Sequence, residues 1–136
     1  MCEMRTYLKE TIKPLMPATV RNALKTVTKY TTTQEISGSS YTKSANTVSQ
    51  DDVWIPSYRE VGFTSSYYES QGVKYSALFP ANSNRVRAKV GGSAYNWFLR
   101  SSYYYDYTYF TGVNYDGSYD YLYCYRTHGV VLGFCM

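Results

Sequence analysis

Between Ser101 and His128 the chain places tyrosine on every second residue, both before and after a short polar turn. The first row is Tyr103, Tyr105, Tyr107 and Tyr109, and the second row is Tyr119, Tyr121, Tyr123 and Tyr125. A repeat of two residues is the side-chain period of a β-strand. This stretch therefore predicts two strands that face each other in a hairpin.

The turn at Asn114 to Gly117 decides which way the two rows point. A two-residue turn would send the rows to opposite faces of the hairpin. A three-residue loop closed by a glycine bulge instead sets Tyr109 opposite Tyr123 and Tyr107 opposite Tyr125. We expect the second arrangement, because Asn at the first position and Gly at the fourth are typical of a type I turn followed by a bulge. All of these tyrosines then share one face.

Such a face is either a buried aromatic core or a surface that binds a ligand. Phenol hydroxyls that are buried each need a hydrogen-bond partner, and the residues between the tyrosines form no consistent polar row. Tyrosine mixed with Ser, Gly and Asp is the composition of binding loops, so we favour a recognition surface. The candidate ligand-binding residues are Tyr103, Tyr105, Asp106, Tyr107, Tyr109, Tyr115, Asp116, Tyr119, Asp120, Tyr121, Tyr123, Tyr125, Arg126 and His128.

The charge distribution bears on the kind of partner. The chain has 136 residues, which predicts one domain, and a net charge of +4. Ser101 to His128 carries one Arg and three Asp, a net charge of −2, which leaves +6 on the remainder. Nucleic-acid binding requires aromatic rings and positive charge on the same surface, so we expect no nucleic-acid partner.

The start of the chain, MCEMRTYLKETI, has acidic residues where a signal peptide needs its apolar core. No apolar run approaches the length of a membrane helix, so we expect no membrane insertion. The helical pattern is already under way at the first residues, so we expect residues 1–136 to be a single domain from the C-terminal part of a longer protein.

Catalysis and redox chemistry have little support in the sequence. Cys2, Cys124 and Cys135 are odd in number and lack the C-x-x-C spacing of zinc and redox sites, so we expect thiols, although Cys2 and Cys135 could meet if the termini are adjacent. Cys124 and His128 are the smallest set of residues that catalysis by a thiol nucleophile requires. Nothing in the sequence would orient His128 as the base, so we expect a protein that is not an enzyme. We expect no cofactor.

A calcium-dependent lectin is a competing class. Chelation of a sugar by calcium needs clustered carboxylates and amides, whereas Asp106, Asp116 and Asp120 occupy expected turn and rim positions. The Glu-Pro-Asn and Trp-Asn-Asp signatures of sugar-binding C-type lectins are absent from the sequence. We therefore expect no metal site, while stacking of a sugar on the tyrosines without a metal stays open.

The rest of the chain predicts an α+β fold in which two N-terminal helices pack on short antiparallel sheets. Apolar residues recur at spacings of three and four from Glu3 to about Tyr30, with Pro17 starting the second helix. The cations between them fit a solvated face: Lys9, Lys13, Arg21, Lys25 and Lys29. Residues 31–50 predict an irregular loop or an edge hairpin. Strands are expected at 53–55, 73–79, 85–90 with its basic residues outward, and 130–135, and a helical turn at 58–61.

Segments on both sides of the tyrosine-rich stretch carry a resemblance to a known family. They are NWFLRS (96–101) and GVVLGFCM (129–136), with CEMRTYL (2–8), MPATVRNALKTVTK (16–29) and DDVWIPSYREV (51–61) before them. Together they resemble the variable proteins of diversity-generating retroelements in bacteria and phages, whose W-W-L-R-S … G-V-x-x-G-F-C ending encloses a hypervariable segment. The resemblance covers nearly the whole chain. It departs from the family at Phe98, where a second Trp is common, and at Ser102, where Pro is common.

The resemblance implies a C-type-lectin-like fold with a hypervariable segment at 101–128. In that family a reverse transcriptase misreads template adenines, and the resulting codons never give Lys, Glu, Gln, Met or Trp. Residues 1–100 contain twenty residues of these five types, whereas residues 101–128 contain none. The family pattern further implies a constant scaffold of the helices with Trp97, Phe98, Leu99, Val130 and Phe134, and fixed positions at Phe110, Val113 and Gly117.

The function implied by the resemblance is recognition of a protein or glycan on a cell surface. The expected location is a phage tail or a bacterial cell surface, where the domain would be attached to a larger protein. The alternatives are a purely structural tail or surface protein and a metal-independent sugar-binding lectin. A shared fold with formylglycine-generating enzymes does not transfer their activity.

Overall fold

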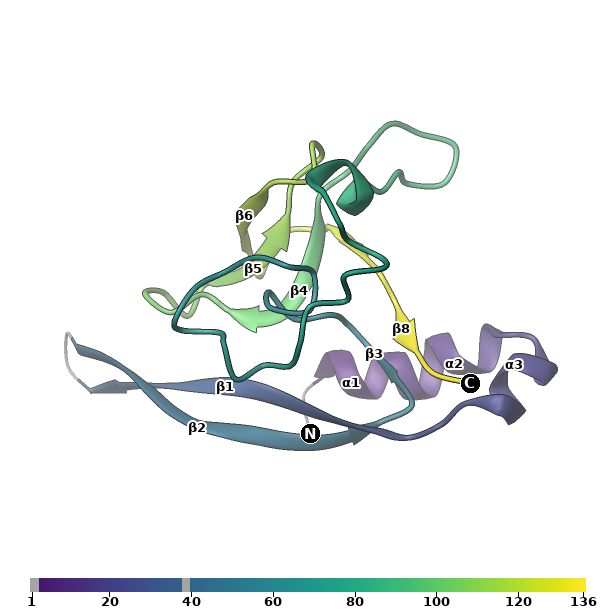
Figure 1. The fold of residues 1–136 in the computed structure, drawn as a ribbon, viewed down its shortest axis with the longest axis horizontal. Coiled ribbons are helices and arrows are strands. Elements are labelled where there is room, and N and C mark those ends of the chain that lie inside the picture. The colour runs from purple at the N-terminus through teal and green to yellow at the C-terminus, as the bar shows by residue number, and fades with distance from the viewer. Residues whose placement is uncertain (1–2, 38–39) are drawn as a thin grey trace.

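The computed structural model describes residues 3–37 and 40–136, which form an α+β fold (Figure 1). Short helical segments come first: α1 (Glu3–Tyr7), the π-helix η1 (Leu8–Ile12), α2 (Lys13–Leu15) and α3 (Ala18–Ala23). The strands are β1 (Val27–Ser37), β2 (Ser40–Asp51), β3 (Val53–Trp54), β4 (Trp97–Ser102), β5 (Tyr109–Val113), β6 (Tyr119–Tyr123), β7 (Gly129–Val130) and β8 (Gly133–Phe134), with the 3₁₀ helix η2 (Asn82–Arg85) before β4. They make two two-stranded sheets, β1-β2 and β3-β8, and one four-stranded sheet in the order β6-β5-β4-β7.

The segments α1, η1 and α2 run without a break from Glu3 to Leu15, as the pattern of the first helix predicts, whereas α3 is shorter than the predicted second helix. Of the residues in α1, η1, α2 and α3, Leu8 alone is buried, and η1 makes the contact with β3. The prediction that the second helix reaches about Tyr30 is wrong, because β1 already begins at Val27. Tyr30 pairs there with Val48 of β2, so pairing with a strand far along the chain overrides the helical spacing.

β1 and β2 form a long antiparallel ribbon that runs along the lower side of the molecule in Figure 1. Of the two structures expected for residues 31–50, the edge hairpin is therefore the right one. The ribbon forms a separate two-stranded sheet. Its pairing runs from Val27 opposite Asp51 to Ser37 opposite Ser40, and the register shifts at a bulge near Thr32.

The tyrosine-rich hairpin has the predicted register, with Tyr109 of β5 opposite Tyr123 of β6. Its turn is also confirmed. The Gly117 amide donates to the Asn114 carbonyl at 2.9 Å, the Asn114 amide donates to the Ser118 carbonyl at 2.8 Å, and Gly117 has a φ of 85°. These are the marks of a type I turn closed by a glycine bulge.

The strands of this hairpin are shorter than predicted. Residues 103–108 form a loop between β4 and β5, and Tyr125 lies in a turn after β6. The prediction that Tyr107 pairs with Tyr125 in a ladder is therefore wrong. β4 and β5 are the two inner strands, and β4 is antiparallel to β5 and parallel to β7.

The hydrophobic core lies on one face of the four-stranded sheet, under the irregular segment 56–79. Its buried members are Tyr58, Val61, Phe63, Tyr68, Phe79, Trp97, Leu99 and Val113. Trp97 is paired with Val113 across β4 and β5, which places both side chains on that face. Val130 and Phe134, which the family pattern places in the constant scaffold, are 38% and 41% exposed.

Two predicted strands are absent from the described chain. Residues 73–79 form coil and a turn, with Val73 exposed, and β-structure in residues 85–90 is limited to an isolated bridge between Ala88 and Ala94. Arg85, expected to point outward, is buried. Its Nε donates to the Val61 carbonyl at 2.7 Å, and its guanidinium lies 4.3 Å from the Phe63 ring centroid.

A buried ion cluster joins β1, the turn after β3, and β4. Glu60 accepts hydrogen bonds from Lys29 Nζ at 3.0 Å, from the Ser57 amide at 2.9 Å and from Arg100 Nη1. Burial alone would raise the pKa of Glu60, but the hydrogen bond and charge of Arg100 hold it below its ordinary value. Lys29 is 7% exposed, so the expectation that it belongs to a solvated face is wrong.

Candidate ligand-binding surface

The tyrosines of the hairpin lie on the same face of the sheet as the core. Because side chains alternate along a strand, Tyr109 points to the same side as Val113, and the register places Tyr119 and Tyr123 there too. Val113 is fully buried at one end of this face, whereas Tyr123 is 39% exposed at the other. The two readings of the sequence, core and surface, therefore describe two ends of one continuous face.

Ring contacts join the loop after β4 to the two strands. The Tyr103 and Tyr121 ring centroids are 3.9 Å apart, and the cross-strand pair Tyr109 and Tyr123 is separated by 4.1 Å. Tyr125 extends the row, with its ring 4.9 Å from that of Tyr123. An aromatic pair contributes about 0.5–1.5 kcal/mol beyond area burial. The rings therefore support one another as a semi-rigid layer.

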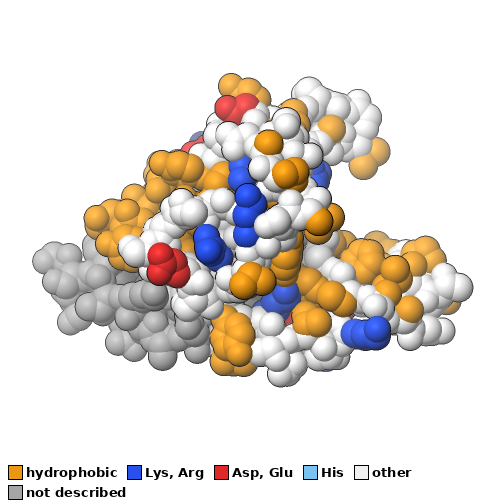
Figure 2. All heavy atoms as spheres, viewed as in Figure 1, with side chains coloured by type: hydrophobic (Ala, Val, Ile, Leu, Met, Phe, Trp, Pro, Cys, Tyr) orange, Lys and Arg blue, Asp and Glu red, His pale blue; other side chains and the backbone are white. Residues whose placement is uncertain are grey.

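Two further tyrosines, Tyr119 and Tyr104, join this layer to the segment 56–79. Tyr119 meets the core rings of Tyr58 at 6.1 Å and Phe63 at 5.9 Å. Tyr104 stacks on Tyr67 at 3.7 Å with an angle of 11° between the rings. We call the resulting set the tyrosine surface, and its members are Tyr67, Tyr103, Tyr104, Tyr105, Tyr107, Tyr109, Tyr119, Tyr121, Tyr123 and Tyr125. Figure 2 shows hydrophobic side chains, tyrosine included, gathered at the left of the view over the loop between β4 and β5 and the adjoining hairpin.

The loop at 103–108 is held by hydrogen bonds at its base and its tip. The Tyr103 amide donates to the Tyr109 carbonyl at 3.0 Å, and the Thr108 amide donates to Asp106 Oδ1 at 2.8 Å. This arrangement leaves Tyr107, at 75% exposure, as the most outward tyrosine of the surface. The loop thus presents rings to solvent from a fixed backbone.

The phenols of Tyr109 and Tyr121 stay neutral at physiological pH. Burial, with the neighbouring phenols, raises the pKa of Tyr121 to about 12. A hydrogen bond with Tyr123 and, as the second cause, burial raise the pKa of Tyr109 to about 12. A neutral phenol both donates and accepts hydrogen bonds, so each ring offers an apolar face and a polar tip to a partner.

The frame beneath the surface is buried and polar. The Tyr68 hydroxyl donates to the Ser102 carbonyl at 3.0 Å, and the Thr111 hydroxyl donates to the Ser101 carbonyl at 2.8 Å. The Tyr58 amide donates to Ser101 Oγ at 3.0 Å. These contacts fix the ends of β4 and β5, from which the tyrosine loop departs.

Several predicted site residues lie away from the tyrosine surface. Tyr115 and Asp116 are exposed at the hairpin turn, at the far end of β5 and β6 from the loop. Asp120 pairs with Gly112 and points to the opposite face of the sheet. His128 also belongs to that side, since its ring packs 5.0 Å from that of Phe98.

One predicted cation lies at the rim of the surface. Arg126 is exposed, and its guanidinium is 5.7 Å from the Tyr125 ring centroid. Sequence reasoning missed Tyr104 and Tyr67 as members of the surface. Tyr104 breaks the alternation of the first row, although three successive tyrosines at 103–105 are an available signal. Nothing local in the sequence connects Tyr67 to this site.

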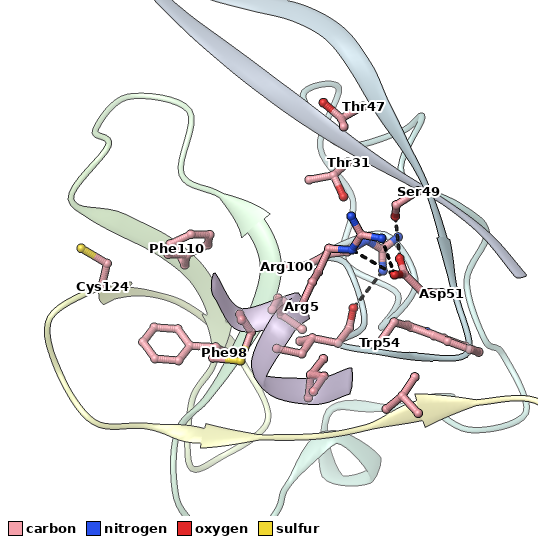
Figure 3. A pocket seen from close by; sticks show the side chains of 15 residues that line it. Arg5, Thr31, Thr47, Ser49, Asp51, Trp54, Phe98, Arg100, Phe110 and Cys124 are labelled. Carbon is pink, nitrogen blue, oxygen red and sulfur yellow. Dashed lines mark hydrogen bonds and ion pairs between the residues drawn. The ribbon is translucent and has the colours of Figure 1, made fainter. Parts of the chain in front are cut away.

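The other face of the sheet borders an open cavity of about 470 Å³ (Figure 3). Its lining is mainly apolar and comes from α1, η1, the ribbon, β3, β4, β5 and Cys124. The lining residues are Met4, Arg5, Leu8, Thr31, Thr47, Ser49, Asp51, Val53, Trp54, Ile55, Phe98, Leu99, Arg100, Phe110 and Cys124. Arg5 donates from Nε and Nη2 to Asp51 Oδ1 at 2.9 and 2.6 Å, so these two charged residues of the cavity lining neutralise each other. In size it is comparable to small-molecule sites.

The thiol and imidazole considered for catalysis are not arranged as a nucleophile and its base. Cys124 is exposed and lines the cavity, whereas His128 packs against Phe98 with its Nδ1 buried and unpartnered. Burial lowers the pKa of His128. Among the side chains that the structure describes, no three of His, Cys, Asp or Glu gather where they could share a metal ion. Cys2 lies outside the described residues.

A family model described as a domain of unknown function (DUF6273) matches residues 1–135. No curated protein and no solved structure gives a significant match to the chain. Among the helices of the described residues, none has the length and hydropathy that crossing a bilayer requires.

Proposed function

We propose that this chain, which belongs to the DUF6273 family, is a ligand-recognition domain that displays a hypervariable, tyrosine-rich surface. In this proposal it is a variable protein of a diversity-generating retroelement with a C-type-lectin-like fold, and 101–128 is its hypervariable segment. The ligand is a macromolecule on a cell surface. The domain acts as part of a phage tail or of a bacterial surface protein, without catalysis.

The observation that carries the proposal is a layer of exposed tyrosines anchored on a buried frame. Exposed rings that are held by stacking supply contact area while losing little entropy on binding. Tyr107 and Tyr123 project from the layer, and exchanging them leaves the core residues Trp97 and Val113 untouched. A surface of this kind can vary in sequence while its backbone stays the same.

The composition of the hypervariable segment supports the same proposal. The five residue types that adenine mutagenesis of such codons cannot produce are missing from 101–128 and frequent before it. Within the segment, the residues that the family pattern treats as fixed have structural tasks. Val113 is fully buried, and Gly117 holds the positive φ of the turn.

The test is a double variant, Tyr107→Ser with Tyr123→Ser, compared with the unchanged chain. Both are screened against a glycan array and against a displayed library of random peptides. Binding should be lost, because the rings that contact the ligand are gone. The melting temperature should fall by several degrees at most, since the change removes the ring contacts of Tyr123 with Tyr109 and Tyr125, about 0.5–1.5 kcal/mol each.

Val130→Ser is the matched control, because Val130 is exposed to the same degree as Tyr123 but lies in β7, away from the tyrosine surface. It should keep both stability and binding. A large loss of stability in the double variant, with no change in binding, would favour a purely structural role. Binding restricted to glycans, at unchanged affinity when divalent ions are removed, would favour the sugar-stacking lectin.

A further inference from the structure

Asp106 is a carboxylate set among the rings of the tyrosine surface. Its Oδ1 accepts from the Thr108 amide at 2.8 Å and from the Thr108 hydroxyl at 2.7 Å. Oδ2 accepts no hydrogen bond from the described part of the chain. The carboxylate is therefore held in one orientation by its neighbour while one oxygen stays available to a partner.

Asp106 lies between Tyr105 and Tyr107 in the loop 103–108, and the rings of this loop contact one another and β5. The Tyr103 ring centroid is 5.8 Å from that of Tyr105 and 6.1 Å from that of Tyr109. Burial is the main cause that raises the pKa of Tyr103, and the hydrogen bond with Tyr123 is the main cause that raises the pKa of Tyr109. The negative charge of Asp106 is a smaller cause in both. Asp106 thus lies close to phenols from both the loop and β5.

The electrostatics of this corner favour a cation. The face of an aromatic ring carries partial negative charge, which attracts an ammonium or guanidinium group within about 6 Å of its centre. Hydrogen bonds from the Thr108 hydroxyl and amide hold the pKa of Asp106 below its ordinary value, so the carboxylate stays ionised at neutral pH. Of the three Asp residues in 101–128, Asp106 alone lies at the tyrosine surface, since Asp116 is at the hairpin turn and Asp120 points to the opposite face of the sheet.

We propose that the tyrosine surface binds a basic segment of a protein, and that one lysine or arginine of this segment sits beside Asp106 against the rings of Tyr103 and Tyr105. The inference rests on the proposed function and narrows it to one class of ligand. Asp106 gives the cation a fixed ionic partner, the rings cover its alkyl stem, and neighbouring exposed tyrosines such as Tyr107 contact the flanking residues of the segment.

The test uses Asp106→Asn, which keeps an oxygen for Thr108 but removes the charge. Its matched control is Asp116→Asn. Asp116 lies at the hairpin turn, away from the tyrosine surface, and accepts from the Ser118 amide at 2.9 Å and hydroxyl at 2.6 Å, the same local pattern as Asp106. Random peptides on phage are selected against the unchanged chain and against the Tyr107→Ser, Tyr123→Ser variant. Peptides captured only by the unchanged chain are then synthesised and titrated against each protein.

Those peptides should be enriched in Lys and Arg relative to the starting library. Asp106→Asn should weaken their binding by about three- to tenfold, and Asp116→Asn should leave it unchanged. Replacing the key Lys or Arg of a peptide by Gln should weaken binding to the unchanged chain but add little on top of Asp106→Asn, because the two changes remove the same interaction.

Two results would overturn the inference, and they are distinct. Peptides that require the tyrosines but show no enrichment in Lys or Arg, or that bind Asp106→Asn equally well, would refute the basic ligand and leave the recognition function standing. If no captured peptide depended on the tyrosines, both this inference and a protein-binding function of the surface would be refuted.

Discussion

Gly117→Ala is the change that most sharply tests how the tyrosine hairpin is fixed to its frame. Gly117 has a φ of 85°, and a Cβ added there would lie 1.9 Å from the backbone carbonyl oxygen of Asn82. No real Cβ approaches a backbone atom so closely, so the turn or the η2 segment must move. That movement would also disturb Arg85, whose Nη1 lies 3.5 Å from the Gly117 carbonyl.

The expected cost has two parts. A left-handed conformation costs a residue with a Cβ about 1–2 kcal/mol relative to glycine. Forcing extra volume into a packed site adds about 1–3 kcal/mol. Gly117→Ala should therefore lower the free energy of unfolding by about 2–5 kcal/mol. Gly91→Ala separates the two parts, because Gly91 also has a positive φ, 68°, but an added Cβ there meets nothing within 4 Å.

The assay is urea unfolding followed by circular dichroism, performed on the unchanged chain and on both variants. Gly91→Ala should lose only the conformational part, about 1–2 kcal/mol. If Gly117→Ala were no more destabilising than Gly91→Ala, the contact between the hairpin turn and η2 would contribute nothing. The tyrosine hairpin would then not be fixed to a rigid frame through this turn.

Further predictions concern the buried ion cluster and the phenols. Glu60→Gln leaves Lys29 and Arg100 without their carboxylate and should cost about 3–5 kcal/mol in the same assay, whereas Gln at the exposed Glu69 should cost almost nothing. The pKa of Glu60 is lowered in the folded chain, so the ionised carboxylate stabilises the fold at every pH above its unfolded pKa of about 4.3. This stabilisation is lost as the pH falls through the folded pKa. The difference in free energy of unfolding between the unchanged chain and Glu60→Gln should therefore close over that acid range. The pKa of Tyr121 is raised from 10.0 to about 12, so its contribution is complete below pH 10 and declines as the pH rises toward 12; Tyr121→Phe should remove absorbance from the high-pH end of a phenolate titration, and loss from the region near pH 10 would contradict the assignment.

The register of the tyrosine hairpin could be predicted because it depends on local chemistry. Asn114 and Gly117 set the turn through two backbone hydrogen bonds and one positive φ. Once the turn type is known, the strands that leave it have no freedom of register. The pairing of Tyr109 with Tyr123 follows directly.

The length of the first strand could not be obtained from the alternation alone. Residues 103–108 keep the period of two, yet they form a loop. Asp106 competes with a ladder by accepting two hydrogen bonds from Thr108, a local pattern of Asp and Thr that is available in the sequence. Alternation predicts which residues can share a face, but a side chain that bonds its own backbone ends the strand.

The buried cations show the limit of local reasoning. The local pattern places Lys29 on a solvated face, but its ammonium group donates to Glu60, thirty-one residues later in the chain. Arg85 likewise alternates with apolar residues as an edge strand would, but its partners include the carbonyl of Val61. Burial of such groups depends on contacts between distant segments, and the spacing of residues along one segment carries no record of them.

The most direct test of a diversified binding surface is the nucleotide sequence on both sides of the gene. If the surface is diversified, a reverse-transcriptase gene lies nearby, with a near-copy of the codons for 101–128 that differs from them chiefly where the copy has adenine. The codons that differ should include those of the exposed members of the tyrosine surface, such as Tyr105 and Tyr107, and should spare Gly117. A genomic neighbourhood with neither the reverse transcriptase nor the copy would contradict the central claim, and the tyrosine surface would then be a fixed one.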